Sequence, residues 1–248
     1  MRLDGKVALI TGAGSPQGIG LATAKLFASE GASTALIDIE EAPLTAAAEA
    51  MGAPHRTYVC DVAEPDQCRN TVAAVAKDFG KIDILINNAG LVRGTPVLDI
   101  SEAEWDRVQD VNVKGNFLMA QAAIPHLKET LGAIVCISSI AGQNGGGVFG
   151  RSHYAASKAG IMGLAKALGR ELAPDGVRCN AIAVGPVDND FTRGAMTREI
   201  KDRIAEQIPL GRLGTPDEIA QCCLFLASDM ASFVTGSVLD ANGGLLIH

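Results

Sequence analysis

Short runs that are almost continuously apolar alternate along this chain with longer segments in which apolar residues recur at helical spacing. The first pattern is typical of strands covered on both faces of a sheet, and the second of amphipathic helices. The pattern predicts strands at residues 6–11, 33–38, 56–60, 82–87, 132–138, 177–183 and 237–241. Among the helices that it predicts are those at residues 18–30, 65–79, 101–128, 152–173 and 215–227.

This alternation predicts an α/β protein with a doubly wound parallel sheet, a Rossmann fold, and helices on both faces. Because no repeat or Pro/Ser-rich linker interrupts it, we expect residues 1–248 to form a single domain. The longest irregular stretch follows the strand at 177–183, at the sheet edge where ligands bind in such folds. We therefore expect a substrate loop at about residues 185–212.

Composition narrows the possible partners. The net charge of −7 and the absence of a basic run argue against a nucleic-acid partner. No stretch reaches about 18 unbroken apolar residues, so the sequence predicts no membrane span. The six cysteines form no C-x-x-C pair and have no histidine at metal spacing, so we expect reduced thiols, a cytoplasmic location and no metal site.

A glycine-rich turn connects the first strand to the first helix, with the sequence TGAGSPQGIG. Glycines allow close approach of the backbone to a phosphate, and the helix that follows directs free N–H groups at the same place. The position of the turn in the first βαβ unit is stronger evidence than the glycines alone. We predict that this turn binds a dinucleotide through Gly12, Gly14, Gln17, Gly18, Ile19 and Gly20.

Asp38 ends the second strand, 18 residues after Gly20. A carboxylate there can accept hydrogen bonds from the adenine ribose and would repel a 2′-phosphate. The glycine turn has no Arg or Lys to offset that charge. The sequence therefore favours NAD over NADP.

Tyr154 stands four residues before Lys158 on a predicted helix, so the two side chains share one face. Lowering a tyrosine pKa by about 3 units takes roughly 4 kcal/mol. An ammonium about 4 Å away supplies a similar amount at an effective dielectric of about 20. By spacing alone the pair could equally be a solvated helix face.

Further motifs favour a reactive Tyr–Lys pair over a solvated helix face, because with them the chain resembles the short-chain dehydrogenase/reductase family. The resemblance rests on TG…GIG, NNAG (87–90), VNVKG (111–115), ISSIAG (137–142) and YAASK (154–158), in the order and approximate spacing of that family. It continues through RCNAIAVGPV (178–187), PLGRLGTPDEIA (209–220) and VTGSVLDANGG (234–244), and so covers essentially the whole chain.

The resemblance implies a role for each of these residues. Tyr154 would exchange a proton with the substrate oxygen, and Lys158 would lower the tyrosine pKa and hold the nicotinamide ribose. Ser139 would hydrogen-bond the reacting oxygen, and Asn112 would hold a water that connects Lys158 to solvent. The other implied cofactor contacts are Asp61, Val62, Asn88, Ala89, Gly90, Gly185 and Val187.

The sequence also departs from the family pattern. The glycine turn and the segment from Ser139 to Tyr154 are each about two residues longer than usual, and Val184 and Asn189 replace the usual Pro and Thr. Substrate binding is expected to involve Ser139, Gln143, Arg151 and Tyr154. His153 is expected on a different helix face from the phenol.

These observations predict an NAD-dependent oxidoreductase that interconverts a secondary alcohol and its ketone. One alternative is a 3-oxoacyl-carrier-protein reductase that uses NADPH, and a remote one is a nucleotide-sensing or scaffold protein without catalysis. The resemblance further implies a homotetramer, with the 101–128 and 152–173 helices in one interface and the C-terminal helix and strand in another.

Overall fold

All seven predicted strands form, and they pair in parallel in the order β3–β2–β1–β4–β5–β6–β7. The computed structural model describes residues 3–52, 54–147, 149–191 and 196–247. The strands are β1 Val7–Thr11, β2 Ser33–Asp38, β3 Arg56–Val59, β4 Ile84–Asn87, β5 Ala133–Ser139, β6 Arg178–Val184 and β7 Val238–Ala241. The predicted doubly wound parallel sheet is confirmed.

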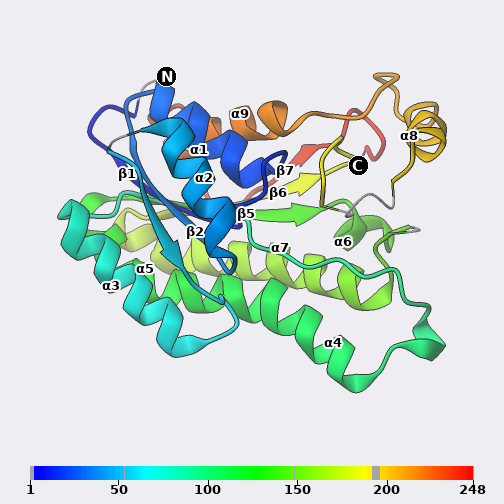
Figure 1. Ribbon diagram of the computed structural model, residues 1–248, viewed down its shortest axis with the longest axis horizontal. Helices are drawn as coiled ribbons and strands as arrows, with labels where there is room; N and C mark the ends of the chain where they lie inside the picture. The colour runs from blue at the N-terminus through cyan, green and yellow to red at the C-terminus, as the bar shows by residue number, and fades with distance from the viewer. Residues whose placement is uncertain (1–2, 53, 148, 192–195, 248) are drawn as a thin grey trace.

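Two helical layers cover the sheet (Figure 1). On one face, α1 (Ile19–Ser29), α2 (Glu41–Met51) and α9 (Pro216–Ala227) pack on one apolar core. On the other face, α3 (Pro65–Phe79), α5 (Gly115–Thr130) and α7 (Ser152–Leu172) pack on a second core. No helix among the described residues combines the length and apolarity needed to cross a membrane.

The expectation that strands are covered on both faces holds for the inner strands and is wrong at the two edges. Strands β1 and β4 are buried throughout, whereas each residue of β3 and β7 is exposed or only half-buried. An edge strand has a neighbour on one side only, so the flanking helices cover it less completely.

The predicted helix at 101–128 is interrupted. It divides into α4 (Glu102–Gln109), a five-residue π-helix (Asp110–Lys114) and α5. A π-turn rotates the residues that follow it, and such turns occur often at functional sites. Here the π-turn contains Asn112, which is fully buried.

Three helices were absent from the sequence prediction: α2, α6 (Ala141–Asn144) and α8 (Arg198–Ala205). The last two are short, and α6 ends at Gly145 in the left-handed region. A segment of one or two turns carries too little periodicity to be recognised from its sequence.

Candidate active site

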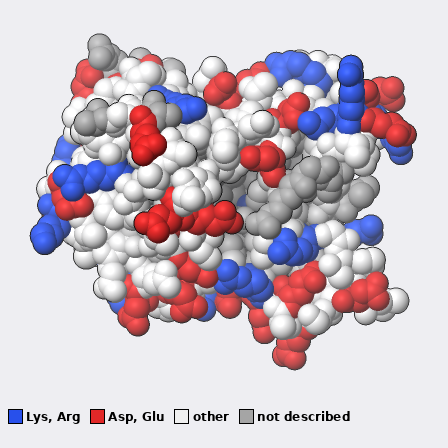
Figure 2. All heavy atoms as spheres, in the orientation of Figure 1, with Lys and Arg blue, Asp and Glu red and all other residues white. Residues whose placement is uncertain are grey.

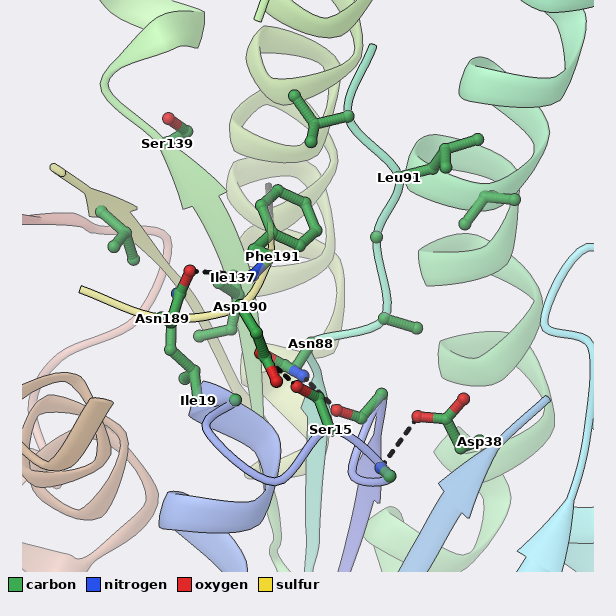
Figure 3. A pocket seen from close by; sticks show the side chains of 18 of the residues that line it. Ser15, Ile19, Asp38, Asn88, Leu91, Ile137, Ser139, Asn189, Asp190 and Phe191 are labelled. Atoms are coloured by element: carbon green, nitrogen blue, oxygen red, sulfur yellow. Dashed lines mark hydrogen bonds between the residues drawn. The ribbon is translucent and has the colours of Figure 1, made fainter. Parts of the chain in front are cut away.

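A cavity of about 940 Å³ opens at the carboxyl ends of the parallel strands. Its wall comes from the glycine turn, from the ends of β2, β4, β5 and β6, and from the start of α7 (Figure 3). Most of the predicted site residues lie on this wall: Gly12, Gly14, Gly18, Ile19, Asp38, Asp61, Val62, Asn88, Ala89, Gly90, Ser139, Tyr154, Lys158, Gly185 and Val187.

The glycine turn forms a close-packed cradle. Gly12 has φ +67°, and a Cβ there would lie 2.8 Å from Asn88 Nδ2. A Cβ on Gly20 would overlap the carbonyl of Gly12, so Gly20 lies beneath the turn rather than on the cavity wall. Helix α1 begins with Gly18 as N-cap and no side-chain cap, which leaves its first N–H groups available to an anion. These features fit the pyrophosphate of a dinucleotide.

Asn88 and Thr11 hold this cradle in place. The Asn88 amide donates to the carbonyls of Thr11 (2.9 Å) and Gly12 (3.0 Å), and Thr11 Oγ1 accepts from the backbone of Asn88 and Ala89 at 2.9 Å each. Asn88 therefore orients the turn rather than presenting its amide to a ligand. The sequence reasoning did not identify Thr11, because its role depends on the pairing of β1 with β4.

At the end of the cavity where the sequence predicts the adenine ribose, here called the adenine end, Asp38 is turned toward the glycine turn (Figure 3). Its Oδ2 accepts from the Gly14 N–H at 2.8 Å, and its Oδ1 from the Ile39 N–H at 2.7 Å. Asp61 lies on the same wall, where Oδ1 accepts from Ala63 N. Acidic side chains border the hollow in the middle of the face shown in Figure 2.

The sequence reasoning missed a cation at this end of the cavity. Arg107 of α4 lies on the wall, and its Nη2 pairs with Asp61 Oδ2 at 3.0 Å. It comes from an element far from the glycine turn in sequence, so only the tertiary structure could place it there. Its charge is already offset by Asp61, which leaves Asp38 without a cationic partner among the contacts that the described residues make.

Tyr154, Lys158 and Ser139 meet at the other end. Tyr154 is only 7% exposed and Lys158 only 3%. The Lys158 ammonium donates to the carbonyl of Ile137 at 2.8 Å and lies 5.6 Å from the centre of the Tyr154 ring. Figure 3 shows Ser139 at the end of its strand.

The pKa values of this pair differ from the sequence-based expectation. Burial raises the pKa of Tyr154 to about 12, and its hydrogen bond with Ser139 opposes that rise. Burial also lowers the pKa of Lys158 to about 8. The net shift of the Tyr154 pKa is therefore upward, because removing the phenol from water outweighs its hydrogen bond with Ser139. The role of Lys158 in lowering that pKa stays a prediction.

Asn112 links three elements. Its Nδ2 donates to the Leu91 carbonyl (2.9 Å) and to Ser157 Oγ (2.8 Å), and its Oδ1 accepts from Leu91 N (2.7 Å). It does not line the cavity. The contacts that it makes anchor the loop after β4. Its implied role of holding a water next to Lys158 stays a prediction.

The loop after β6 closes the remaining side. Gly185 packs against Asn242, where a Cβ would lie 2.6 Å from Asn242 Cα. Ser15 of the glycine turn donates a hydrogen bond to Asp190 Oδ1 across the cavity (Figure 3). The Phe191 ring lies 6.5 Å from that of Tyr154. Of the predicted substrate loop, residues 192–195 lie outside the described part of the chain.

The remaining predicted residues are elsewhere. Gln17 and Arg151 are exposed and do not line the cavity. Gln143 donates to Asp240 of β7 at 2.9 Å and is also off the wall. The cavity wall instead includes Leu91, Val92, Arg93, Phe191 and Met196, of which Phe191 lies next to Tyr154. No cluster of three or more metal-binding side chains was found among the described residues.

Gly150 packs directly on the Tyr154 ring, where an added Cβ would lie 2.8 Å from Cε1 and closer still to Cδ1. We expect Gly150→Ala to displace the ring and lower kcat by about 10–100-fold, because small misplacements of a reacting group have effects of that order. Gly147→Ala is the matched control, since a methyl group there meets nothing within 4 Å. Steady-state kinetics of both variants tests this, and equal rates would contradict it.

Fold and site together define a nicotinamide-dependent oxidoreductase. A family model described as enoyl-(acyl carrier protein) reductase matches residues 12–246. The uncharacterised short-chain type dehydrogenase/reductase y4mP of Sinorhizobium fredii is 45% identical, with all of both chains covered. The chain belongs to the short-chain dehydrogenase/reductase family.

Other relatives have named activities. The 3-oxoacyl-acyl-carrier-protein reductase FabG of Thermotoga maritima is 43% identical, with all of both chains covered. The (3R)-3-hydroxyacyl-CoA dehydrogenase of Mus musculus is 36% identical over 100% of this chain and 98% of that protein. The crystal structure of gox2181 superposes with a TM-score of 0.93 at 34% identity, covering 98% of this chain and 96% of that one.

Proposed function

We propose that this protein is an NAD-preferring oxidoreductase that interconverts a secondary alcohol and its ketone, with Tyr154 as the acid/base. The observation that carries the proposal is the buried Tyr154 phenol on the cavity wall, which also includes Ser139, with the Lys158 ammonium 5.6 Å from the centre of the phenol ring. A bound oxidised nicotinamide would supply the acceptor for the hydride of the alcohol carbon, and its positive charge would favour the phenolate.

The chain's own residues supply the proton chemistry and the orientation. In the oxidation direction the Tyr154 oxygen takes the alcohol proton, and in the reduction direction it returns that proton to the ketone oxygen. Ser139 orients the same oxygen with a second hydrogen bond. Lys158 is held by the Ile137 carbonyl, where its charge faces the phenol ring.

The charge of Asp38 supports a preference for NAD over NADP. Its carboxylate faces the glycine turn, and Glu40 adds negative charge to the same wall. A 2′-phosphate would meet these charges, whereas a ribose diol would find acceptors. A screen of secondary alcohols with NAD⁺, followed at the nicotinamide absorbance, tests the whole proposal. Absence of turnover with every alcohol and ketone tried, with either cofactor, would contradict it.

A second candidate is the reduction of 3-oxoacyl thioesters. It is favoured by the names of the relatives, which include a 3-oxoacyl-acyl-carrier-protein reductase and a 3-hydroxyacyl-CoA dehydrogenase. Acetoacetyl-CoA with NADH or NADPH distinguishes the candidates, because efficient turnover with NADPH would favour the carrier-protein reductase. The homotetramer and the cytoplasmic location stay predictions, and light scattering would test the first.

The pH dependence follows from the two pKa values. Alcohol oxidation needs the phenolate, so with the Tyr154 pKa raised to about 12 its kcat/KM should rise by about tenfold per pH unit below neutrality. The slope should lessen above about pH 8, where Lys158 loses its charge and stabilises the phenolate less. Ketone reduction uses the protonated phenol and should not rise with pH. Initial rates in both directions measure this, and an oxidation rate that falls with pH would contradict it.

A further inference from the structure

His153 immediately precedes Tyr154 and is completely buried, on the side of α7 that faces α4. Its Nε2 lies 3.0 Å from Glu104 Oε1. A carboxylate can only accept, so this contact places the histidine proton on Nε2. Its Nδ1 has no hydrogen-bond partner among the described residues, so the contact with Glu104 is the one hydrogen bond of the ring in this part of the chain.

The Glu104 carboxylate is itself held in place. Its side chain is 28% exposed, and it lies near Thr95 of the loop after β4. The polar contacts with Thr95 and His153 lower the pKa of Glu104, so the carboxylate is charged where it accepts from the ring. Glu104 thus connects the loop beside the cavity to the residue before Tyr154.

Two further contacts reach the same turn of α7. Gln109 Nε2 donates to the His153 carbonyl at 2.9 Å. Ser157 Oγ, which accepts from Asn112, donates to the Tyr154 carbonyl at 2.7 Å. Gln109 of α4 therefore holds the backbone before the Tyr154 α-carbon, and Ser157 of α7, which is hydrogen-bonded to Asn112 of the π-turn, holds the backbone after it.

Local structure alone would leave this turn poorly fixed. The N-cap of α7, Arg151, makes no side-chain cap hydrogen bond. The segment before it contains three successive glycines, Gly145 to Gly147, and the first two have positive φ. Glycine-rich backbone loses its conformational freedom only when other contacts restrain it.

We propose that His153, through its hydrogen bond to Glu104, is a positioning residue that fixes the first turn of α7 and with it the direction of the Tyr154 phenol. The phenol and the imidazole leave the helix on different faces, so the histidine acts through the backbone and does not touch the substrate. The proposal rests on the acid/base role of Tyr154.

The test compares two replacements of the histidine. Glutamine places an N–H donor near the position of Nε2, and methionine fills similar space without a donor. We expect His153→Met to lower kcat by about tenfold or more while the dissociation constant for NADH, measured by its fluorescence, changes by less than about twofold. His153→Gln should restore kcat to within about threefold of the unmodified protein.

Ser101→Ala is the matched control, because it removes the cap of α4 and leaves the contact between Glu104 and His153 in place. It should lower the melting temperature without lowering kcat. If His153→Met does not fold, the hydrogen bond can be removed from the other side, at the partly exposed Glu104. Glu104→Ala removes the acceptor and should lower kcat, whereas Glu104→Gln keeps an acceptor oxygen and should not.

Equal kcat for the methionine and glutamine variants would overturn the positioning role, whether both are active or both impaired. This outcome is distinguishable from failure of the proposed function. If Tyr154→Phe is inactive and His153→Met is fully active, only the positioning role fails. If Tyr154→Phe is fully active, the acid/base assignment fails first.

Discussion

Tyr154→Phe is expected to lower kcat for alcohol oxidation by about 10²–10⁴-fold, the usual contribution of a positioned acid/base. The substitution removes one oxygen atom from a side chain that is almost fully buried. The ring can keep its packing against Gly150 and Phe191, so the variant should fold. The lost rate therefore reports the proton transfer and not the stability of the protein.

The chain provides its own control for this experiment. Tyr58, its only other tyrosine, lies on the edge strand β3, where its hydroxyl donates to Asp78 at 2.8 Å. Tyr58→Phe should leave kcat unchanged. Turnover of Tyr154→Phe close to that of the Tyr58 variant, at equal NADH affinity, would exclude Tyr154 as the acid/base.

Asp38→Asn is expected to change the ratio of kcat/KM for NAD to that for NADP by about 10–100-fold in favour of NADP. Two like charges about 5 Å apart repel by roughly 1–3 kcal/mol at effective dielectrics of about 20–80. Asparagine keeps the shape and an acceptor for the Gly14 N–H, so the substitution isolates the charge. Kinetics with both cofactors at fixed alcohol concentration measures the ratio.

Glu41→Gln is the matched control for Asp38→Asn. Glu41 is exposed at the start of α2 and does not line the cavity, yet its replacement changes the net charge by the same amount. It should leave the cofactor ratio unchanged. An unmodified protein that already prefers NADP, or an Asp38→Asn ratio equal to that of the control, would remove the argument from Asp38.

Arg107 has a bearing on the second prediction. Its pairing with Asp61 uses the one arginine that α4 brings to the adenine end of the cavity wall. If Asp38 no longer repelled a 2′-phosphate, this guanidinium could attract it only by loosening its contact with Asp61. In Asp38→Asn, kcat/KM with NADP should therefore rise by a smaller factor than the factor by which the ratio of kcat/KM for NAD to that for NADP falls.

Several parts of the site could be predicted because they depend on local spacing. The glycine turn and Asp38 follow directly from the ends of β1 and β2, which pair in parallel, so their meeting needs only the fold class. Tyr154 and Lys158 share a helix face at any place where residues 152–172 are helical. For the same reason, the position of His153 away from the phenol was predicted correctly.

Other parts were decided by contacts between segments far apart in the chain. Whether burial or a nearby charge governs the pKa of Tyr154 depends on how completely the phenol is enclosed, which no spacing shows. The π-turn at Asp110–Lys114, the position of Arg107 and the turn of Gln143 toward Asp240 likewise depend on partners from distant elements.

The sequence by itself determined the parallel sheet, the glycine cradle, the acid at the end of β2 and the Tyr–Lys pair. Each of these is encoded in a period or a spacing within one or two elements, where backbone geometry leaves little choice. Only the tertiary structure decided which side chains line the cavity, what charge the adenine end carries and how the start of α7 is held. Those features arise where α4, α7 and the strand ends come together, and the packing of the helical layers on the sheet determines the relative positions of these elements.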